Sequence, residues 1–341
     1  MTIAKRITRL SLLGCSILFF IMIVEAALRI GLIRNEFRDH VGRIVGQSRQ
    51  GKHKILLLGD STAKLIFEPL SRKLAARDAA LMDGSWSGDG PLTYDLEMRF
   101  DAGLFKPDTV ILFYSASTDL TDVQYKSKAV VSSYNLFYGS YIFHYLRQIK
   151  YALMLRSFDY REFEKRGVDP EFLSLVKENA ANPWLAYESA KKRNFIADNL
   201  LMETKDNADA WDSIKKLLGD IKERCDRSKS KFVIVIFPST LQVNESHYVF
   251  FEKMNFSVDE KILRSDRPQS LMREFCEEQN MPCLDLLPYL RARRNTEWFQ
   301  TKDDHLNRAG QEFASAVIAD FLEKTRSCPV KTGSMTGGHA P

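Results

Sequence analysis

The chain has 341 residues, of which 27% are charged and 45% are hydrophobic. These fractions are those of an ordinary globular protein, and they exclude a disordered or low-complexity chain. The 49 Lys and Arg residues exceed the 44 Asp and Glu residues by five, an excess too small and too dispersed to indicate a nucleic-acid partner. Five cysteines over this length do not form a disulfide framework.

The N-terminal part of the chain is much more apolar than the rest. Residues 10–33 carry no charge apart from Glu25 and Arg29, and they follow a charged segment, residues 1–9. A helix of these 24 residues is about 36 Å long, enough to cross a hydrocarbon core of about 30 Å. Glu25 and Arg29 are four residues apart, so they can pair on one helix face. We therefore predict a transmembrane anchor over residues 10–33.

Three other interpretations of this segment fit less well. A cleaved signal peptide needs a site with small residues after the apolar run, and Glu25-Ala26-Ala27 is a poor one. A lipoprotein signal at Cys15 would have only a few apolar residues before the cysteine. A buried core helix does not fit an all-round apolar terminal segment. Basic residues flank both ends, so their distribution does not decide the orientation, and residues 34–51 are predicted to be a polar juxtamembrane linker.

Beyond the linker, apolar β-rich runs bounded by turn residues predict strands. They cover residues 55–58, 79–82, 109–114, 232–237 and 282–286. The stretches between them predict helices, among them residues 62–76 with an interruption at Pro69, a helix ending near Leu104, and a last helix containing Phe313, Val317 and Phe321. Strands that alternate with helices predict an α/β fold, with a parallel sheet covered on both faces. Ligands of such sheets bind at the carboxyl ends of the strands, in the loops after Leu58, Met82, Tyr114 and Phe237.

Two segments depart from this alternation. Residues 120–206 are rich in aromatic and then in charged side chains, and they are predicted to be a mostly helical insertion. A smaller insertion is predicted at about 240–265. Aromatic and aliphatic side chains at helical spacing favour internal packing. A groove for a chain-like substrate, or contact with a membrane surface, is the alternative.

Gly59-Asp60-Ser61 lies where the first predicted strand ends and a helix begins. A Ser at such a turn exposes its hydroxyl group at the carboxyl edge of the sheet, where a nucleophile is needed. The alternative is that Asp60, Ser61 and Thr62 only cap the helix.

His305 is preceded directly by Asp303 and Asp304, at the start of the C-terminal helix. A nucleophilic Ser needs a base within hydrogen-bond reach and a carboxylate that orients the base. None of the other five histidines combines two carboxylates directly before it with a place at the start of the C-terminal helix, and His339 is discounted because it lies in a polar tail. The alternative is that one of the two Asp residues only caps the helix. A metal site is not predicted, because no second His or Cys lies at ligand spacing.

The loop over residues 85–90 contains Gly88 and Gly90, whose missing side chains let backbone N–H groups approach a ligand closely. Such donors can bind the negative charge that develops on an acyl-transfer intermediate. The alternative is an ordinary turn.

Together these features resemble the GDSL/SGNH hydrolase superfamily over about residues 52–325. The resemblance rests on ILLLGDS at the first strand, the Gly loop, a polar segment after the third strand, and DxHLNxxG before the last helix. It implies a three-layer α/β/α, flavodoxin-like domain over residues 52–326, with no cofactor or metal.

The resemblance also implies roles for individual residues. Ser61 would be the nucleophile, His305 the general base and Asp303 the residue that orients the base. The backbone N–H groups of Ser61 and Gly88 would be oxyanion donors, with Thr118 as the third donor.

This sequence departs from the family pattern at two positions. The orienting Asp usually lies three residues before the His, where this chain has Lys302. Asp303 fits a two-residue spacing, and Asp304 points away from His305 in an extended segment. Thr118 stands where the family has an Asn donor. A lost oxyanion donor costs about 100- to 1000-fold in rate, so activity is modest or Ser117 substitutes.

The resemblance implies a serine-dependent acyl ester hydrolase or O-acetyltransferase acting on acylated carbohydrate of the cell envelope or exopolysaccharide. The single anchor resembles that of membrane-anchored bacterial SGNH proteins, which implies an inner-membrane location and a periplasmic domain. The alternative is a catalytically weak or inactive carbohydrate-binding or assembly protein of the same fold. Cys276 and Cys283 either form a bridge or stay buried free thiols. Residues 327–341 are predicted to be a disordered tail.

Overall fold

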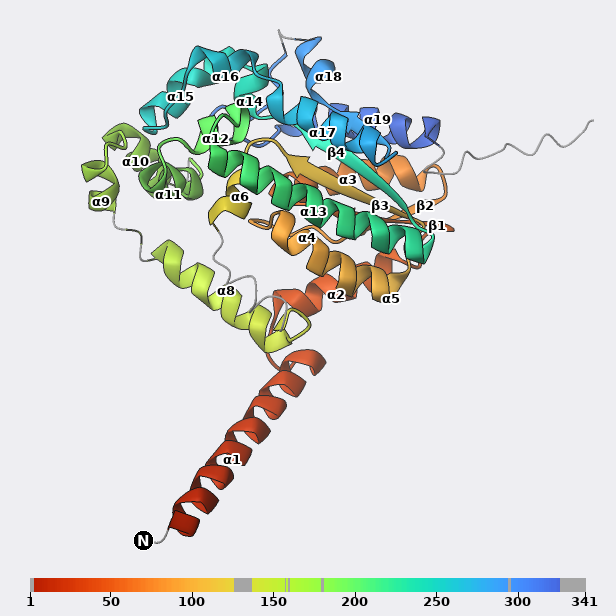
Figure 1. Cartoon of the computed structure of the whole chain (residues 1–341), viewed down its shortest axis with the longest axis vertical. Helices are drawn as coiled ribbons and strands as arrows, with labels where there is room; N and C mark the ends of the chain where they lie inside the picture. The colour runs from red at the N-terminus through yellow and green to blue at the C-terminus, as the bar shows by residue number, and fades with distance from the viewer. Residues whose placement is uncertain are drawn as a thin grey trace, which may run out of the picture.

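Five parallel strands form one sheet at the centre of the computed structural model, which describes residues 3–125, 137–156, 158, 160–178, 181–293 and 296–325 (Figure 1). The order across the sheet is β2-β1-β3-β4-β5, with β1 at His53–Leu58, β2 at Ala79–Asp83, β3 at Thr109–Ser115, β4 at Lys231–Phe237 and β5 at Cys283–Asp285. This is the flavodoxin-like order. The strands are nearly continuous apolar runs because both faces of the sheet are covered.

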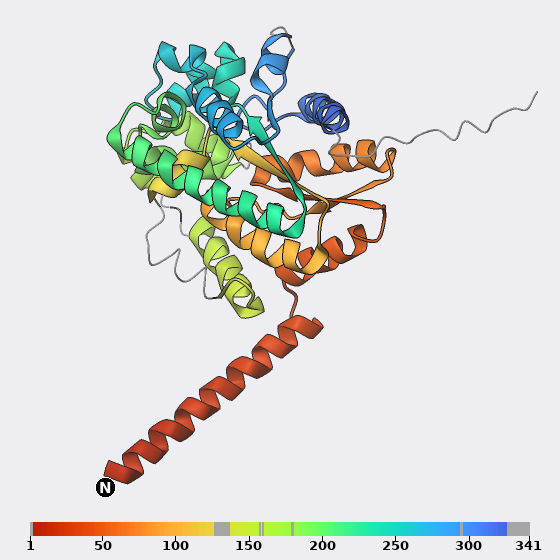
Figure 2. The same ribbon diagram turned by 45° about the vertical axis from the view of Figure 1, so that its right-hand side comes forward.

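Helices cover the sheet on both faces, which confirms the predicted fold class (Figure 2). On one face, α3 (Ser61–Ala75) and α19 (Arg308–Lys324) pack against alternate strand residues such as Ile55 and Leu57. On the other face, Leu56 and Leu58 meet α13 (Lys205–Ser228), α4 (Pro91–Glu97) and α17 (Arg267–Glu278). A π-helical turn at Met98–Ala102 and the short α5 (Gly103–Phe105) follow α4.

The predicted interruption at Pro69 is wrong, because α3 runs unbroken from Ser61 to Ala75. A proline inside a helix removes one backbone hydrogen bond. Burial of the neighbouring side chains Ile66 and Leu70 against the sheet holds the helix together across that missing bond.

The two insertions form one additional helical layer beside the carboxyl ends of the strands. The first insertion contributes α9 (Tyr160–Lys165), α10 (Pro170–Lys177), α11 (Pro183–Lys191) and α12 (Phe195–Leu201). The second contributes α14 (Thr240–Val243), a 3-10 turn (Glu245–His247), α15 (Tyr248–Lys253) and α16 (Glu260–Arg264). These helices share a hydrophobic cluster separate from the two that cover the sheet. In it the rings of Phe172 and Phe250 lie 5.5 Å apart, so the insertions stabilise each other.

The N-terminal helix α1 (Ile3–Ile30) projects away from the rest of the chain (Figure 1). Its stretch Leu12–Ile30 has a mean hydropathy of 2.1 and is long and apolar enough to cross a membrane. Only 6% of that stretch is buried, so it is not a core helix. The helix ends at Ile30 because Gly31 adopts a left-handed φ of 86°.

The segment predicted as a linker is instead an ordered helix, α2 (Glu36–Gln47), packed on the domain. The Asn35 side chain caps it by accepting a hydrogen bond from the Phe37 N–H group at 2.7 Å. Phe37, His40 and Ile44 lie on one face at helical spacing and are buried. The average composition of residues 34–51 is polar, so composition alone does not predict this narrow apolar face.

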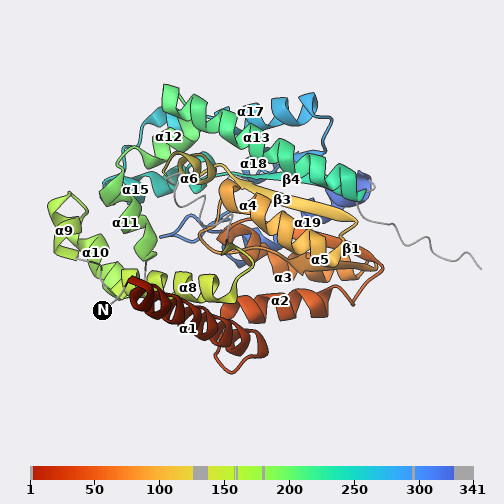
Figure 3. The same ribbon diagram turned by 60° about the horizontal axis from the view of Figure 1, so that its bottom comes forward.

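The predicted pairing within α1 is confirmed, since Arg29 Nε donates to Glu25 Oε1 at 2.9 Å. Glu25 also accepts from the backbone N–H groups of Tyr141 and Ile142, at 3.0 and 2.9 Å. These residues begin α8 (Tyr141–Arg156), which lies next to α1 (Figure 3). A carboxylate of the apolar helix therefore caps the start of a second helix.

We expect Glu25→Ala to loosen the first turn of α8. The N–H groups of Tyr141 and Ile142 would lose their acceptor, and loss of a helix cap costs about 1 kcal/mol. Hydrogen exchange of residues 141–145 in the full chain should therefore accelerate about fivefold. Glu25→Gln keeps an acceptor oxygen and should show a smaller change. Equal exchange in the parent chain and Glu25→Ala would contradict this role.

Cys276 and Cys283 are free thiols, so the bridge considered from the sequence is not formed. A hydrogen bond from one thiol to the other, together with burial, raises the pKa of Cys276. Cys328 and the predicted disordered tail at 327–341 lie outside the described residues.

Candidate active site

The turn after β1 brings Ser61 to the carboxyl edge of the sheet. Gly59 has a φ of 150°, and a Cβ atom there would lie 2.7 Å from the Ala63 Cβ atom and 3.0 Å from that of Phe113. Only glycine fits this close approach. The Asp60 side chain caps α3 by accepting from the Thr62 N–H group at 2.8 Å. Asp60 is therefore the residue that caps the helix. The Ser61 hydroxyl group can bond to another partner.

That partner is His305. Ser61 Oγ lies 2.7 Å from His305 Nε2, and His305 Nδ1 lies 2.8 Å from Asp303 Oδ1. A proton on Nδ1 that donates to Asp303 leaves Nε2 as the acceptor for the Ser61 hydroxyl group. Residues 244 positions apart thus form one continuous hydrogen-bonded chain.

The structure brings Asp303, and not Asp304, to the His305 ring. The Asp304 side chain turns the other way and accepts from the Thr240 N–H group at 2.8 Å. Its complete burial raises its pKa to about 6. Neither Asp caps α19, because Asn307 does so by accepting from the Gly310 N–H group at 2.9 Å.

The charges around His305 favour its protonated form. Burial alone would lower the pKa of His305, but the hydrogen bond and charge of Asp303 outweigh burial and raise it. The buried carboxyl groups of Asp60 and Asp304 add to this effect. Burial would raise the pKa of Asp303, but the hydrogen bond and charge of His305 lower it overall. The pair is therefore arranged to stabilise an imidazolium ion beside a carboxylate.

Two supports of this arrangement were not predicted from the sequence. Asn182, which caps α11, donates from Nδ2 to Asp303 Oδ1 at 3.4 Å. Behind Asp304, Thr240 Oγ1 lies 2.8 Å from His247 Nδ1, and His247 Nε2 lies 2.8 Å from Glu297 Oε1. The Asn-Pro pair at 182–183 signals a helix start, but no local signal tells which distant residue its side chain meets.

The Gly loop after β2 is tied to the Ser61 turn, since the Trp86 N–H group donates to the Gly59 carbonyl group at 3.1 Å. Gly88 adopts a left-handed φ of 78°, and a Cβ atom built there meets nothing within 4 Å. The backbone at Gly88 thus borders open space. The Asp89 carboxylate accepts a hydrogen bond from Arg147 of α8, which fixes the far side of the loop.

Thr118 lies in the turn between β3 and α6 (Asp119–Tyr125), also at the carboxyl edge of the sheet. Its hydroxyl group is buried and has no hydrogen-bond partner among the described residues. The Ser117 hydroxyl group is committed elsewhere, because it bonds to Ser115 at 3.1 Å and to Asp304. Of the two hydroxyl groups considered from the sequence, only that of Thr118 therefore has no partner among the described residues.

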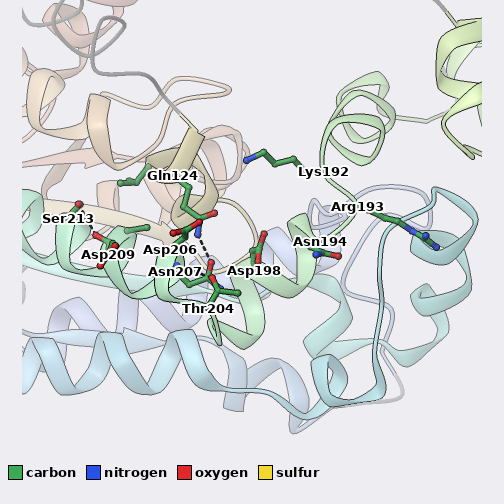
Figure 4. A pocket seen from close by; sticks show the side chains of 12 residues that line it. Gln124, Lys192, Arg193, Asn194, Asp198, Thr204, Asp206, Asn207, Asp209 and Ser213 are labelled. Carbon is green, nitrogen blue, oxygen red and sulfur yellow. Dashed lines mark hydrogen bonds between the residues drawn. The ribbon is translucent and has the colours of Figure 1, made fainter.

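A separate polar cavity of about 790 Å³ lies between α6, α12 and α13 (Figure 4). Gln124, Lys192, Asp198 and Asn207 are among its lining residues. Burial lowers the pKa of Lys192 to about 8. None of the three residues of the Ser61–His305–Asp303 chain lines this cavity or its neighbour of about 520 Å³.

No family model matches the chain, and no curated protein matches it. Solved structures with similar chain traces include a lipase/acylhydrolase from Enterococcus faecalis, at 13% identity and a TM-score of 0.41, covering 80% of this chain and 97% of the other. An acetylxylan esterase from Geobacillus stearothermophilus has 11% identity and a TM-score of 0.44, covering 80% and 94%. A GDSL-like lipase from Bacteroides thetaiotaomicron has 11% identity and a TM-score of 0.40, covering 84% and 95%. These likenesses concern the chain trace alone.

Proposed function

We propose that this chain is a serine-dependent ester hydrolase of the GDSL/SGNH type. The observation that carries the proposal is the hydrogen-bonded chain from Asp303 through His305 to Ser61, with links of 2.8 and 2.7 Å. A nucleophile, a base and an orienting carboxylate in this order are the parts that acyl transfer to a serine requires.

In the proposed reaction, Ser61 Oγ attacks the acyl carbonyl carbon while His305 Nε2 takes the hydroxyl proton. Asp303 holds the ring in the required tautomer and stabilises the imidazolium ion. His305 then gives the proton to the leaving alcohol oxygen as the ester bond breaks, which leaves the acyl group on Ser61. Water hydrolyses this acyl-enzyme by the same steps. An O-acetyltransferase would use a sugar hydroxyl group in place of water.

The proposed oxyanion donors are the N–H groups of Ser61 and Gly88 and the Thr118 hydroxyl group. The Ser61 N–H group lies in the first turn of α3, where backbone N–H groups have no helical partner. The Thr118 hydroxyl group, which has no hydrogen-bond partner in the part of the chain that the structure describes, supports the third donor.

We expect Thr118→Val to lower kcat about 100-fold, because one donor to the oxyanion would be lost. Valine keeps the shape of the side chain, and removal of the hydroxyl group breaks no hydrogen bond within the described residues. Initial rates on p-nitrophenyl acetate would measure the effect, with Thr118→Ser, which keeps the hydroxyl group, as the control. A rate equal to that of the parent chain would remove Thr118 from the oxyanion site.

The pH dependence of kcat/KM should report the ionisation of His305, because only the neutral ring can accept the Ser61 proton. The pKa of His305 is raised above its ordinary value of 6.5. Activity is therefore expected at high pH and is lost as the pH falls through a midpoint above 6.5. The midpoint should move down in Asp303→Asn, because the carboxylate that raises the pKa is absent. A parent midpoint below 6.5 would contradict this assignment.

The proposed substrate is an acylated carbohydrate of the cell envelope or an exopolysaccharide, and the proposed location is the bacterial inner membrane with a periplasmic domain. The resemblance of the sequence and the apolar α1 helix support this proposal. The alternative is a non-catalytic carbohydrate-binding or assembly protein, which is the expected function if Thr118 does not replace the Asn donor that the resemblance implies.

Acetate release by the purified full chain separates these functions. Ser61-dependent release from acetylated xylo-oligosaccharide supports the hydrolase, and Ser61-dependent transfer of the acetyl group to an unacetylated oligosaccharide supports the transferase. Binding of either sugar without turnover of any ester supports the alternative. A reporter fused after Pro341 tests the orientation, and activity of a cytoplasmic reporter alone would overturn the periplasmic placement.

A further inference from the structure

Helix α8 has two unlike faces. On one face, the His144 ring stacks on Phe37 of α2 with centroids 3.8 Å apart, and Arg147 donates to Asp89 of the Gly88 loop. The opposite face carries Leu146, Ile149 and Leu153, whose side chains are 58%, 39% and 58% exposed. Spacings of three and four residues place these three side chains in one row along the helix. We call this set the α8 row.

The residues beside the α8 row carry positive charge. Lys150 and Arg156 are exposed on the same helix, and Phe137, shortly before the helix, is 49% exposed. Single exposed apolar side chains are ordinary. An exposed apolar row flanked by Lys and Arg is typical of helices that lie in the surface of an anionic membrane.

The start of α8 is held at the end of the helix that can span a membrane. Glu25 accepts from the N–H groups of Tyr141 and Ile142, and Arg29 donates to the Gly139 carbonyl group at 3.3 Å. The Arg29 guanidinium group also lies 4.6 Å from the centre of the Tyr141 ring. From this junction α8 runs crosswise to α1 (Figures 1 and 2). A helix that starts at the end of a membrane-spanning helix and runs crosswise to that helix lies along the bilayer surface.

We propose that α8 is an interfacial helix, whose row Leu146, Ile149 and Leu153 inserts into the surface of the bilayer that α1 crosses. Lys150 and Arg156 would meet the phosphate groups of anionic lipids. The opposite face of α8 binds Asp89, so the loop that contains Gly88 is held at a fixed place relative to the membrane. The proposal rests on α1 spanning the membrane, and it does not depend on the proposed catalytic activity.

Nitroxide labels on the full chain in vesicles of phosphatidylethanolamine and phosphatidylglycerol test this proposal. The variants Leu146→Cys and Leu153→Cys report on the α8 row. They are made in a parent chain in which Cys15 and Cys328 are replaced by Ser. The signal of that parent chain, labelled in the same way, is subtracted. Tyr289→Cys is the control, because Tyr289 is 46% exposed on α18 (Leu287–Arg291), far from α1 (Figures 1 and 2). The native Cys15, labelled alone, gives the value for a position within α1.

Labels at 146 and 153 should collide several-fold more with oxygen, which concentrates in lipid, than with a water-soluble nickel chelate, as at Cys15. The label at 289 should show the reverse. Collision with the chelate at 146 and 153 equal to that at 289 would overturn the proposal. Protection from both reagents would also overturn it, because protein, such as a second copy of the chain, would then cover the row. A Cys15 label open to the chelate would overturn the spanning role of α1.

Discussion

Ser61→Ala should abolish ester hydrolysis, with kcat falling about a million-fold toward the uncatalysed rate. The substitution removes the only atom that can form the acyl-enzyme in the proposed reaction, and His305 and Asp303 then have no proton to move. The Ser61 hydroxyl group bonds to His305 at 2.7 Å. Alanine loses this contact and adds no atoms, so we expect the fold to be kept. Hydrolysis of p-nitrophenyl acetate by the purified full chain measures the effect.

A matched control lies on the same helix. Ser71 is part of α3 and far along it from the turn, so Ser71→Ala should keep the parent rate. Thermal unfolding of both variants establishes that each is folded. Hydrolysis by folded Ser61→Ala at a rate near that of the parent chain would exclude Ser61 as the nucleophile.

Asp303→Asn should lower kcat about ten-thousand-fold, because the amide no longer holds the His305 ring in the tautomer that accepts the Ser61 proton. The effect on stability should be small, since Asn has nearly the size and shape of Asp and its amide N–H group can donate to an unprotonated His305 Nδ1. The same esterase assay measures it, over the pH range in which the parent chain is active.

Asp304→Asn is the natural control for this variant. Asp304 accepts from the Thr240 N–H group, and an Asn carbonyl oxygen can accept the same bond, so the control should stay close to the parent chain. An inactive Asp304→Asn together with an active Asp303→Asn would reverse the assignment and require a different arrangement of the segment before α19.

The sheet and the residues of the candidate site were predictable because their signals are local. Strands buried on both faces are continuous apolar runs, as over residues 109–114, and parallel pairing then places their ends at one edge. This edge is where the sequence predicts Ser61, at the end of a strand, to meet Asp303 and His305, which precede the last helix. The catalytic roles of these residues stay predictions until they are measured.

The features that the sequence did not predict depend on distant contacts. The segment at 36–47 has a polar composition, and only packing of Phe37 on His144 and its neighbours shows that it belongs to the domain. Pro69 was predicted to interrupt a helix because propensity does not include burial against a sheet. Asn182 and Asp303 lie 121 residues apart, so their contact is set by how the first insertion docks on the strands.

A fluorophosphonate probe measures whether Ser61 is activated, because it reacts with a serine activated by a neighbouring base and needs no knowledge of the natural substrate. We expect a single phosphonate adduct in the parent chain, located on the peptide that contains Ser61. Ser61→Ala should form no adduct, and Asp303→Asn should form it slowly. A folded parent chain that acquires no adduct, or that acquires it on another residue, would exclude Ser61 as an activated nucleophile.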